Sequence, residues 1–183
     1  MQTQPPLWAH GYFGRSVGKV RLQAVRHYLQ QQAAHHGYDR RVLAPVYRYR
    51  AESRTVLSSP HAVFDLSHHL VLGTSCRKGV FTSEVGAELV DYWLRVAAKH
   101  EFAIDQVTVV PDHVHSIVRI KPKMSIEECA LSLMNNGQHF MARRYGELLV
   151  AVGLNELWQP SAYAGTCGDY TSALIKSWLR SPE

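Results

Sequence analysis

The chain has 183 residues, of which 46% are hydrophobic and 19% charged, and its net charge is +5. This length suits one globular domain with a hydrophobic core, and the sequence has neither an apolar run long enough to span a membrane nor a first segment that reads as a secretory signal. The three cysteines are far apart and form no CxxC pair, which argues against a disulfide framework and a cysteine zinc site and predicts a cytoplasmic protein without a membrane partner.

Hydrophobic periodicity and turn signals predict three helices and three strands. The helices are expected at about 19–36, 83–101 and 125–145, and the strands at 62–75, 104–111 and 113–120. The last two strands are joined too tightly for a parallel crossover, so they are predicted to be antiparallel. From residue 62 onward this order is that of an α+β, ferredoxin-like sandwich, with an antiparallel sheet and helices on one face, lacking only its last strand.

The two ends of the chain resemble each other. Residues 7–18 read LWAHGYFGRSVG and residues 157–168 read LWQPSAYAGTCG, in register at an offset of about 150 residues. We interpret them as two copies of one segment, although two amphipathic helices can also resemble each other by chance. The chain is therefore predicted to be a single domain, 1–183, with four parts: an N-terminal helix segment (1–36), a connector (37–60), a core (61–156) and a degenerate second copy of the N-terminal segment (157–183).

Two histidines stand one residue apart in the run PDHVHSIVRI. Side chains alternate across a strand, so His113 and His115 are expected on the same face, where two neutral imidazoles can bind one divalent ion. Such a pair can also be purely structural. A histidine-triad hydrolase would have a third histidine at Ile117, a metallo-β-lactamase would continue HxHxDH, and an amidohydrolase would need a longer chain.

The N-terminal helix offers residues that could complete such a site. Tyr28 and Gln32 are four residues apart and so lie on one helical face, where they could also be ordinary edge residues. Beside a metal, a tyrosine can attack phosphorus to form a phosphotyrosine, and a glutamine amide oxygen can complete the ligand set.

Basic segments recur at 40–54, 76–79, 119–123 and 141–145. Arginines interleaved with Tyr47 and Tyr49 suit a polyanion with unpaired bases, and a solvated basic surface is the alternative.

Residues 62–145, including PDHVH, resemble in order and spacing the HUH single-tyrosine transposases of bacterial insertion sequences and their REP-associated relatives. In that family a segment like LW…GYF…SVG…YL..Q ends the chain and carries the catalytic tyrosine. Here the good match, LWAHGYFGRSVGKVRLQAVRHYLQQQ, is residues 7–32, whereas the C-terminal copy has Trp178 in place of the tyrosine and Pro182 in place of the glutamine. The chain therefore looks like a circularly permuted member, and residues 61–156 would be its HUH core.

The resemblance implies a homodimer that binds imperfect hairpins and cuts and rejoins single-stranded DNA with Mg2+ or Mn2+, through a 5′-phosphotyrosine. It makes Tyr28 the nucleophile and His113, His115 and Gln32 the metal ligands. Candidate phosphate contacts are Arg77, Lys78, Arg119, Lys121 and Lys123. Two other functions stay open: a cleavage-deficient, domesticated regulator that binds DNA hairpins, and a phosphodiesterase acting on small molecules.

Overall fold

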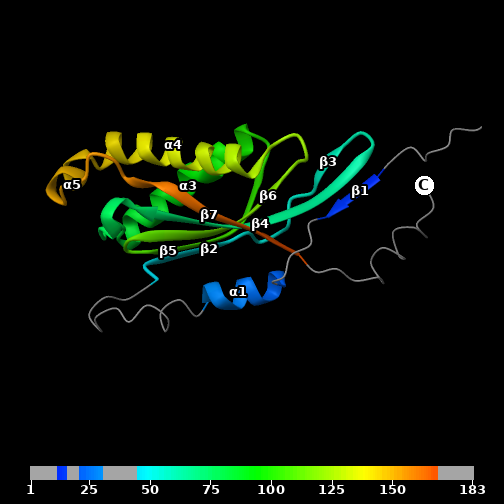
Figure 1. The fold of residues 1–183 in the computed structure, drawn as a ribbon, viewed down its shortest axis with the longest axis horizontal. Coiled ribbons are helices and arrows are strands. Elements are labelled where there is room, and N and C mark those ends of the chain that lie inside the picture. The colour runs from blue at the N-terminus through cyan, green and yellow to red at the C-terminus, as the bar shows by residue number, and fades with distance from the viewer. Residues whose placement is uncertain (1–11, 16–20, 31–44, 169–183) are drawn as a thin grey trace, which may run out of the picture.

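The computed structural model describes residues 12–15, 21–30 and 45–168, which form an α+β domain (Figure 1). The helices are α1 (Leu22–Gln30), the short 3-10 helix η1 (Ser75–Arg77), α3 (Ser83–Lys99), α4 (Ile126–Arg144) and α5 (Gly146–Ala151). The strands are β1 (Tyr12–Arg15), β2 (Tyr47–Arg50), β3 (Leu57–Ser59), β4 (Ala62–Thr74), β5 (Ala103–Val110), β6 (His113–Ile120) and β7 (Trp158–Cys167).

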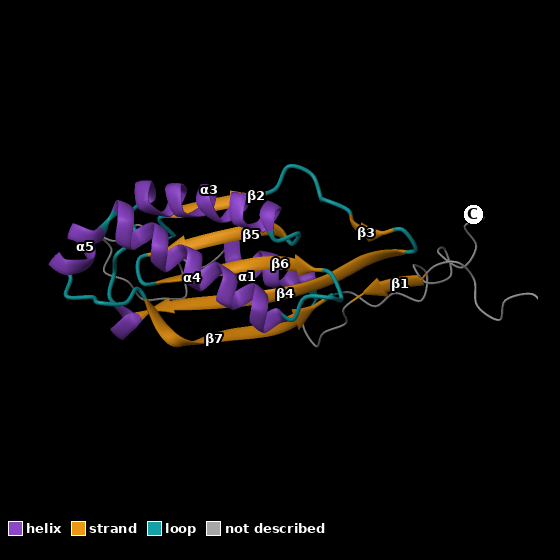
Figure 2. Cartoon of the chain, turned by 90° about the horizontal axis from the view of Figure 1, so that it is seen from above, coloured by secondary structure: helices purple, strands orange, loops and turns teal. Residues whose placement is uncertain are grey.

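The main sheet has the strand order β7-β4-β6-β5-β2, and each pair of neighbours is antiparallel. The 13-residue strand β4 runs beyond this sheet, and its outer half pairs with β3 and, in parallel, with β1 (Figure 2). The α+β prediction and the antiparallel pairing of β5 and β6 are confirmed.

The prediction that the sandwich lacks its last strand is wrong, because β7 pairs with β4 along the edge of the sheet. Its sequence, WQPSAYAGTC, contains Pro160 and several small residues in place of alternating β-branched ones, so the strand signal is weak. A proline is tolerated there because β7 is an edge strand of the described sheet.

The connector, predicted without secondary structure, contributes β2 and β3. In β2 the sequence YRYR alternates with the strand period, so that Tyr47 and Tyr49 are half-buried against the core while Arg48 and Arg50 are exposed. β2 thereby covers the edge of β5, which would otherwise present unpaired backbone groups.

Helices α3 and α4 cover one face of the sheet (Figure 1). Ser125 begins α4 with a capping box to Glu128, as the sequence predicts. Two buried tryptophans fix the position of α4, because the indole N–H groups of Trp93 and Trp158 donate to its carbonyl oxygens at 2.9 and 3.0 Å. Gly137 permits this approach, since a Cβ there would lie 3.1 Å from the Trp93 indole nitrogen.

Helix α1 lies on the opposite face of the sheet (Figure 1). Its buried residues Leu22 and Val25 form a separate hydrophobic cluster with Ile117 of β6 and Cys167 of β7. The prediction that the helices share one face therefore holds for α3 and α4 but not for α1. Residues 31–36 of the predicted first helix lie outside the described residues, and none of the described helices is long and apolar enough to cross a membrane.

A buried carboxylate on the α1 face joins the N-terminal parts of the chain to the core. The pairing of β5 with β6 shifts between Ile104 and Gln106, and this bulge contains Asp105. Arg119 holds the Asp105 carboxylate through two nitrogens at 2.8–3.0 Å, Arg54 of the connector lies at 3.2 Å, and Arg26 of α1 at 3.9 Å. Asp105 thus lies within 4 Å of arginines from three segments and links these segments to one another.

Candidate functional site

The two histidines of β6 converge on one point of the α1 face. Their Nε2 atoms are 3.0 Å apart, and the side chains are buried, with 2% and 4% of their surfaces exposed for His113 and His115. A cation with metal–nitrogen bonds of roughly 2.1 Å holds two ligand nitrogens roughly 3.0–3.4 Å apart. The pair therefore fits two adjacent positions around one divalent ion.

Asp112 orients the first of these imidazoles. Its Oδ1 lies 2.7 Å from His113 Nδ1, while its Oδ2 accepts a hydrogen bond from Arg77 Nε at 2.9 Å. Arg77 Nη2 also approaches His113 Nδ1 at 3.1 Å, but a guanidinium cannot accept a proton, so we assign the proton on Nδ1 to the shorter contact with the carboxylate. His113 consequently directs the lone pair of Nε2 toward His115, as a carboxylate-oriented metal ligand does.

Helix α1 brings Tyr28 to this pair within one chain. The Tyr28 ring is 5.7 Å from the His115 ring and 6.5 Å from the His69 ring, in edge-on contacts. The packing of Leu22 and Val25 on Ile117 determines this position, because Val25 and Tyr28 are one helical turn apart. Tyr28 keeps 37% of its surface exposed.

A cavity of about 490 Å³ lies between the Tyr28 end of α1 and the sheet. It is lined by Tyr28, His69, His115 and Tyr163, together with smaller residues of α1, β4 and β7. Tyr163 is 61% exposed, and its ring is 5.8 Å from that of His69. Its hydroxyl lies across Gly165, where a Cβ would be only 2.7 Å away, so glycine permits this orientation.

The strand part of segment 157–183 lies beside the histidines, on the other side of this cavity from α1. β7 forms one wall of the cavity because it pairs with β4 at the edge of the sheet, where Tyr163 lies opposite Val71. Gln32, Trp178 and Pro182 lie outside the described residues. Within the described ranges, no cluster of three or more His, Cys, Asp or Glu side chains is placed to hold a metal, so the pair needs a further ligand of another kind or from elsewhere.

His69 is a site residue that the sequence analysis did not single out. Its Nε2 lies 3.1 Å from His115 Nδ1, and burial lowers its pKa to about 4, so the ring is neutral near pH 7. The sequence around it, DLSHHLVL, shows two histidines in a strand, and only the pairing of β4 with β6 shows which of them meets His115.

The predicted phosphate contacts have different surroundings in the structure. Arg77 is about half exposed and lies beside the site. Lys78 donates to the carbonyl oxygens of Val152 and Gly153 that end α5, and Lys121 and Lys123 pair with Glu101. Arg119 is buried and pairs with the Asp105 carboxylate in this arrangement, and its contact with DNA stays a prediction.

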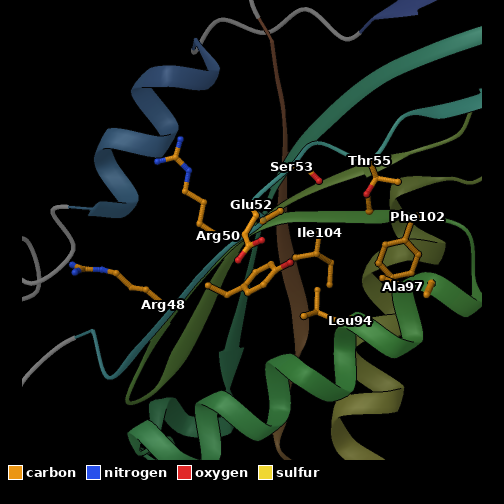
Figure 3. Close-up of a pocket in the computed structure, with 13 residues that line it drawn as sticks. Arg48, Arg50, Glu52, Ser53, Thr55, Leu94, Ala97, Phe102 and Ile104 are labelled. Carbon is orange, nitrogen blue, oxygen red and sulfur yellow. The ribbon is translucent and has the colours of Figure 1, made fainter.

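A larger cavity, of about 700 Å³, lies between β2, β5 and α3 at the far edge of the sheet (Figure 3). None of the predicted catalytic or metal-binding residues lines it, so this larger cavity is not the candidate active site. Figure 3 does show Arg48 and Arg50 extending from β2 toward the side of the sheet on which α1 lies.

An antiparallel sheet with a two-helix layer and a histidine pair on its central strand is the fold of the HUH-type transposases. The family described as "Transposase IS200 like" matches residues 62–181, about two thirds of the chain, and the chain belongs to this family. Transposases of this family act in the transposition of insertion sequences, which involves cutting and transferring DNA. Its match extends through the C-terminal copy, so this copy occupies the position of the family's own last segment.

Individual relatives agree with this assignment. The chain is 28% identical over 119 residues to the ISDra2 transposase TnpA of Deinococcus radiodurans, and this match covers 65% of this chain and 85% of that protein. It is 22% identical over 123 residues to the transposase for insertion sequence element IS200 of Salmonella typhimurium. This match covers 67% of this chain and 80% of that protein. A crystal structure of a Deinococcus radiodurans R1 protein described as a transposase has a similar fold, with a TM-score of 0.52 and 23% identity over 72% of this chain and 94% of that one.

Proposed function

We propose that this protein is a single-stranded DNA transposase that cleaves and rejoins DNA next to hairpin ends, through a 5′-phosphotyrosine on Tyr28. The observation that carries the proposal is the meeting of Tyr28 from α1 with His115 from β6, at a ring separation of 5.7 Å beside an open cavity. A tyrosine beside convergent histidines suits phosphoryl transfer better than a structural role, because Tyr28 stays partly exposed where a core residue would be covered.

In this proposal His113 and His115 hold a divalent cation, Mg2+ or Mn2+, with Gln32 as the third protein ligand. The 3.0 Å separation of the two Nε2 atoms and the Asp112 contact on His113 support this ligand set. When bound there, such a cation would polarise the scissile phosphate and favour attack on it.

The Tyr28 hydroxyl attacks the phosphorus, a bond forms between the phenol oxygen and phosphorus, and the bond from phosphorus to the 3′ oxygen breaks. In net terms the phenol proton ends on the leaving 3′ oxygen, so that the products are a 5′-phosphotyrosine and a free 3′-OH. Attack of a 3′-OH on the phosphotyrosine reverses the step and rejoins strands. Helix α1 contributes by holding the nucleophile over His115.

The α1 face of the sheet is where we place the DNA. Arg48 and Arg50 of β2 are exposed toward this side, and the half-exposed Arg77 lies beside the histidines, so these three arginines suit phosphates. The exposed ring of Tyr163 suits stacking of an unpaired base. Lys78, Lys121 and Lys123 would contact DNA only where a phosphate replaces their present oxygen partners.

We also propose that the protein is a homodimer that acts in the cytoplasm. β2 and β7 are the outer strands of the described sheet, and pairing of such an edge with a second copy of the chain is one way to cover its backbone groups. Sedimentation at micromolar concentration should give a dimer, and a monomer alone would contradict this part of the proposal.

The test is a cleavage assay with Mg2+ or Mn2+ on single-stranded DNA carrying the hairpins that flank the gene. The wild-type protein should form a covalent adduct with the 5′ side of the cut, and Tyr28→Phe should form none while still binding the hairpin. Tyr163→Phe is the matched control, because it removes the other tyrosine hydroxyl of the cavity and should keep the adduct. An adduct on Tyr28→Phe that disappears in Tyr163→Phe would transfer the nucleophile to β7.

A second candidate is a cleavage-deficient regulator that binds DNA hairpins. The loss of the tyrosine and glutamine from the C-terminal copy, at Trp178 and Pro182, favours it. Hairpin binding by wild-type protein without any adduct, with either metal, would select this candidate.

A further inference from the structure

His69 lies on β4 beside the histidine pair, and none of the roles above uses it. The pairing of β4 with β6 places Val71 opposite His115, and His69 opposite Ile117, so that His69 reaches His115 diagonally. The two rings are within 15° of coplanar. Their centroid separation of 5.3 Å is about the 3.1 Å nitrogen–nitrogen distance extended by the two ring radii, so the rings meet edge to edge, in the direction of an imidazole hydrogen bond.

The position of the proton in this contact matters for metal binding. A neutral imidazole has one N–H, and the nitrogen that binds a cation must present its lone pair. For His113 the Asp112 carboxylate keeps the proton on Nδ1 and leaves Nε2 available. His115 faces the imidazole of His69, which can either accept from Nδ1 or donate to it, depending on the tautomer.

These two arrangements have opposite consequences. If His69 Nε2 accepts the Nδ1–H of His115, the lone pair of His115 Nε2 points at His113 and at the cation position. If His69 Nε2 donates instead, the proton of neutral His115 sits on Nε2 and blocks that position. The tautomer of His69 therefore decides whether His115 can be a ligand.

We propose that His69 is a positioning residue, which accepts the hydrogen bond from His115 Nδ1 and so fixes the tautomer in which His115 binds the divalent cation. This inference rests on the proposed function, in which His113 and His115 are the protein's metal-binding histidines. The site then has two unequal supports, a carboxylate for His113 and a neutral imidazole for His115. Because a neutral acceptor holds a proton less firmly than a carboxylate, His115 is the ligand that depends more on its support.

The neighbouring residue His68 provides a matched control. It belongs to the same strand, but alternation places its side chain on the opposite face, toward the helix layer. Burial lowers its pKa too, and its Nδ1 has no partner among the described residues. A change at His68 therefore alters a half-buried histidine of β4, as His69 is, without touching His115.

The experiment measures the affinity of the full-length protein for Mn2+ by electron paramagnetic resonance, without DNA. His69→Phe keeps a flat ring but removes the acceptor, and we expect its dissociation constant to rise about 10- to 100-fold, as for other partners of ligating histidines. His69→Gln, whose amide oxygen can replace the Nε2 acceptor, should recover most of the affinity, and His68→Phe should leave it unchanged. Equal affinity of wild type and a folded His69→Phe would overturn the inference.

Nitrogen-15 NMR of the wild-type protein with Mg2+ gives an independent answer that needs no variant to fold. His115 should carry its proton on Nδ1 and His69 should be unprotonated at Nε2. A proton on His69 Nε2 in the Mg2+ form would overturn the inference as well. If His113→Ala and His115→Ala do not weaken Mn2+ binding, the proposed function fails. If those two variants lose Mn2+ affinity while His69→Phe keeps it, only the His69 inference is refuted.

Discussion

The two terminal segments that we interpret as copies contribute different parts of the candidate site. The N-terminal copy supplies α1, which carries Tyr28, and its residues Tyr12–Arg15 pair in parallel with the outer half of β4. The equivalent residues of the C-terminal copy, 162–165, belong to β7 and pair antiparallel with the inner half of β4. One copy therefore supplies the candidate nucleophile and the other completes the sheet.

This difference teaches that two segments of similar sequence can contribute different elements to one site. A strand needs backbone pairing and tolerates many side chains, so β7 forms although its sequence carries a weak strand signal. A nucleophile needs one particular side chain, so a copy with Trp178 in that position cannot replace one with Tyr28. The two copies meet at Cys167 of β7, which packs against Leu22 and Val25 of α1.

The largest expected effect is the complete loss of the covalent adduct when the tyrosine is moved from Tyr28 to position 178 of the C-terminal segment. Trp178→Tyr in a Tyr28→Phe background should give no adduct. Helix α1 still lies over His115 in this variant, with phenylalanine in place of Tyr28, so it keeps a second tyrosine from reaching the histidines. Denaturing electrophoresis of the DNA–protein adduct measures this. Recovery of the adduct would show that the two copies can exchange places at the histidines.

The next effect tests the structural role of the C-terminal copy. Trp158→Ala should lower the free energy of unfolding by about 3–5 kcal/mol, because the buried indole stacks on Trp93 and donates to Met134. Urea unfolding measures the change. A loss below about 1 kcal/mol would mean that β7 contributes little to the stability of the core.

The corresponding change in the N-terminal copy should separate activity from stability. Val25→Ala removes two buried methyl groups, so the packing of α1 on the sheet should become about 1.5 kcal/mol less favourable. Adduct formation should fall by up to about tenfold as a result. The unfolding midpoint of the core should change less than in Trp158→Ala, because α1 packs through a separate small cluster. A large loss of core stability would instead make α1 part of the core.

The smallest effect concerns Cys167, where the copies meet. Burial raises its pKa to about 11, so at pH 8 only about one thiol in a thousand is ionised, and the thiolate is the reactive form. Iodoacetamide should label the exposed Cys76 first, and labelling of Cys167 should rise about tenfold per pH unit up to its pKa. Mass spectrometry of peptides resolves the sites.

The labelling also reports on the docking of α1. Val25→Ala should increase labelling of Cys167 and leave that of Cys129 low, because burial raises the pKa of Cys129 to about 12 within the main core. Rapid labelling of Cys167 in wild-type protein would mean that α1 does not cover it in solution.

Much of this protein follows from the sequence by itself. Apolar patterns and turn signals determine α3, α4, β5 and β6 nearly to the residue. The helices repeat at the helical period, whereas β5 and β6 are short strands buried on both faces. Strand alternation likewise determines that His113 and His115 share a face. The spacing of Tyr28 and Gln32 places them on one helical face, and the resemblance of residues 7–32 to the family's tyrosine segment makes Tyr28 the candidate nucleophile.

Only the tertiary structure decided the features that depend on partners. The arginine-rich β2 and the proline-containing β7 become strands because β5 and β4 offer them hydrogen bonds, which no local pattern shows. Arg119 resembles a phosphate contact in sequence and becomes a buried ion pair because a bulge turns Asp105 toward it. His69 acquires its contact with His115 for the same reason: the register between two strands is a property of the sheet, and it determines which side chains meet across 46 residues of chain.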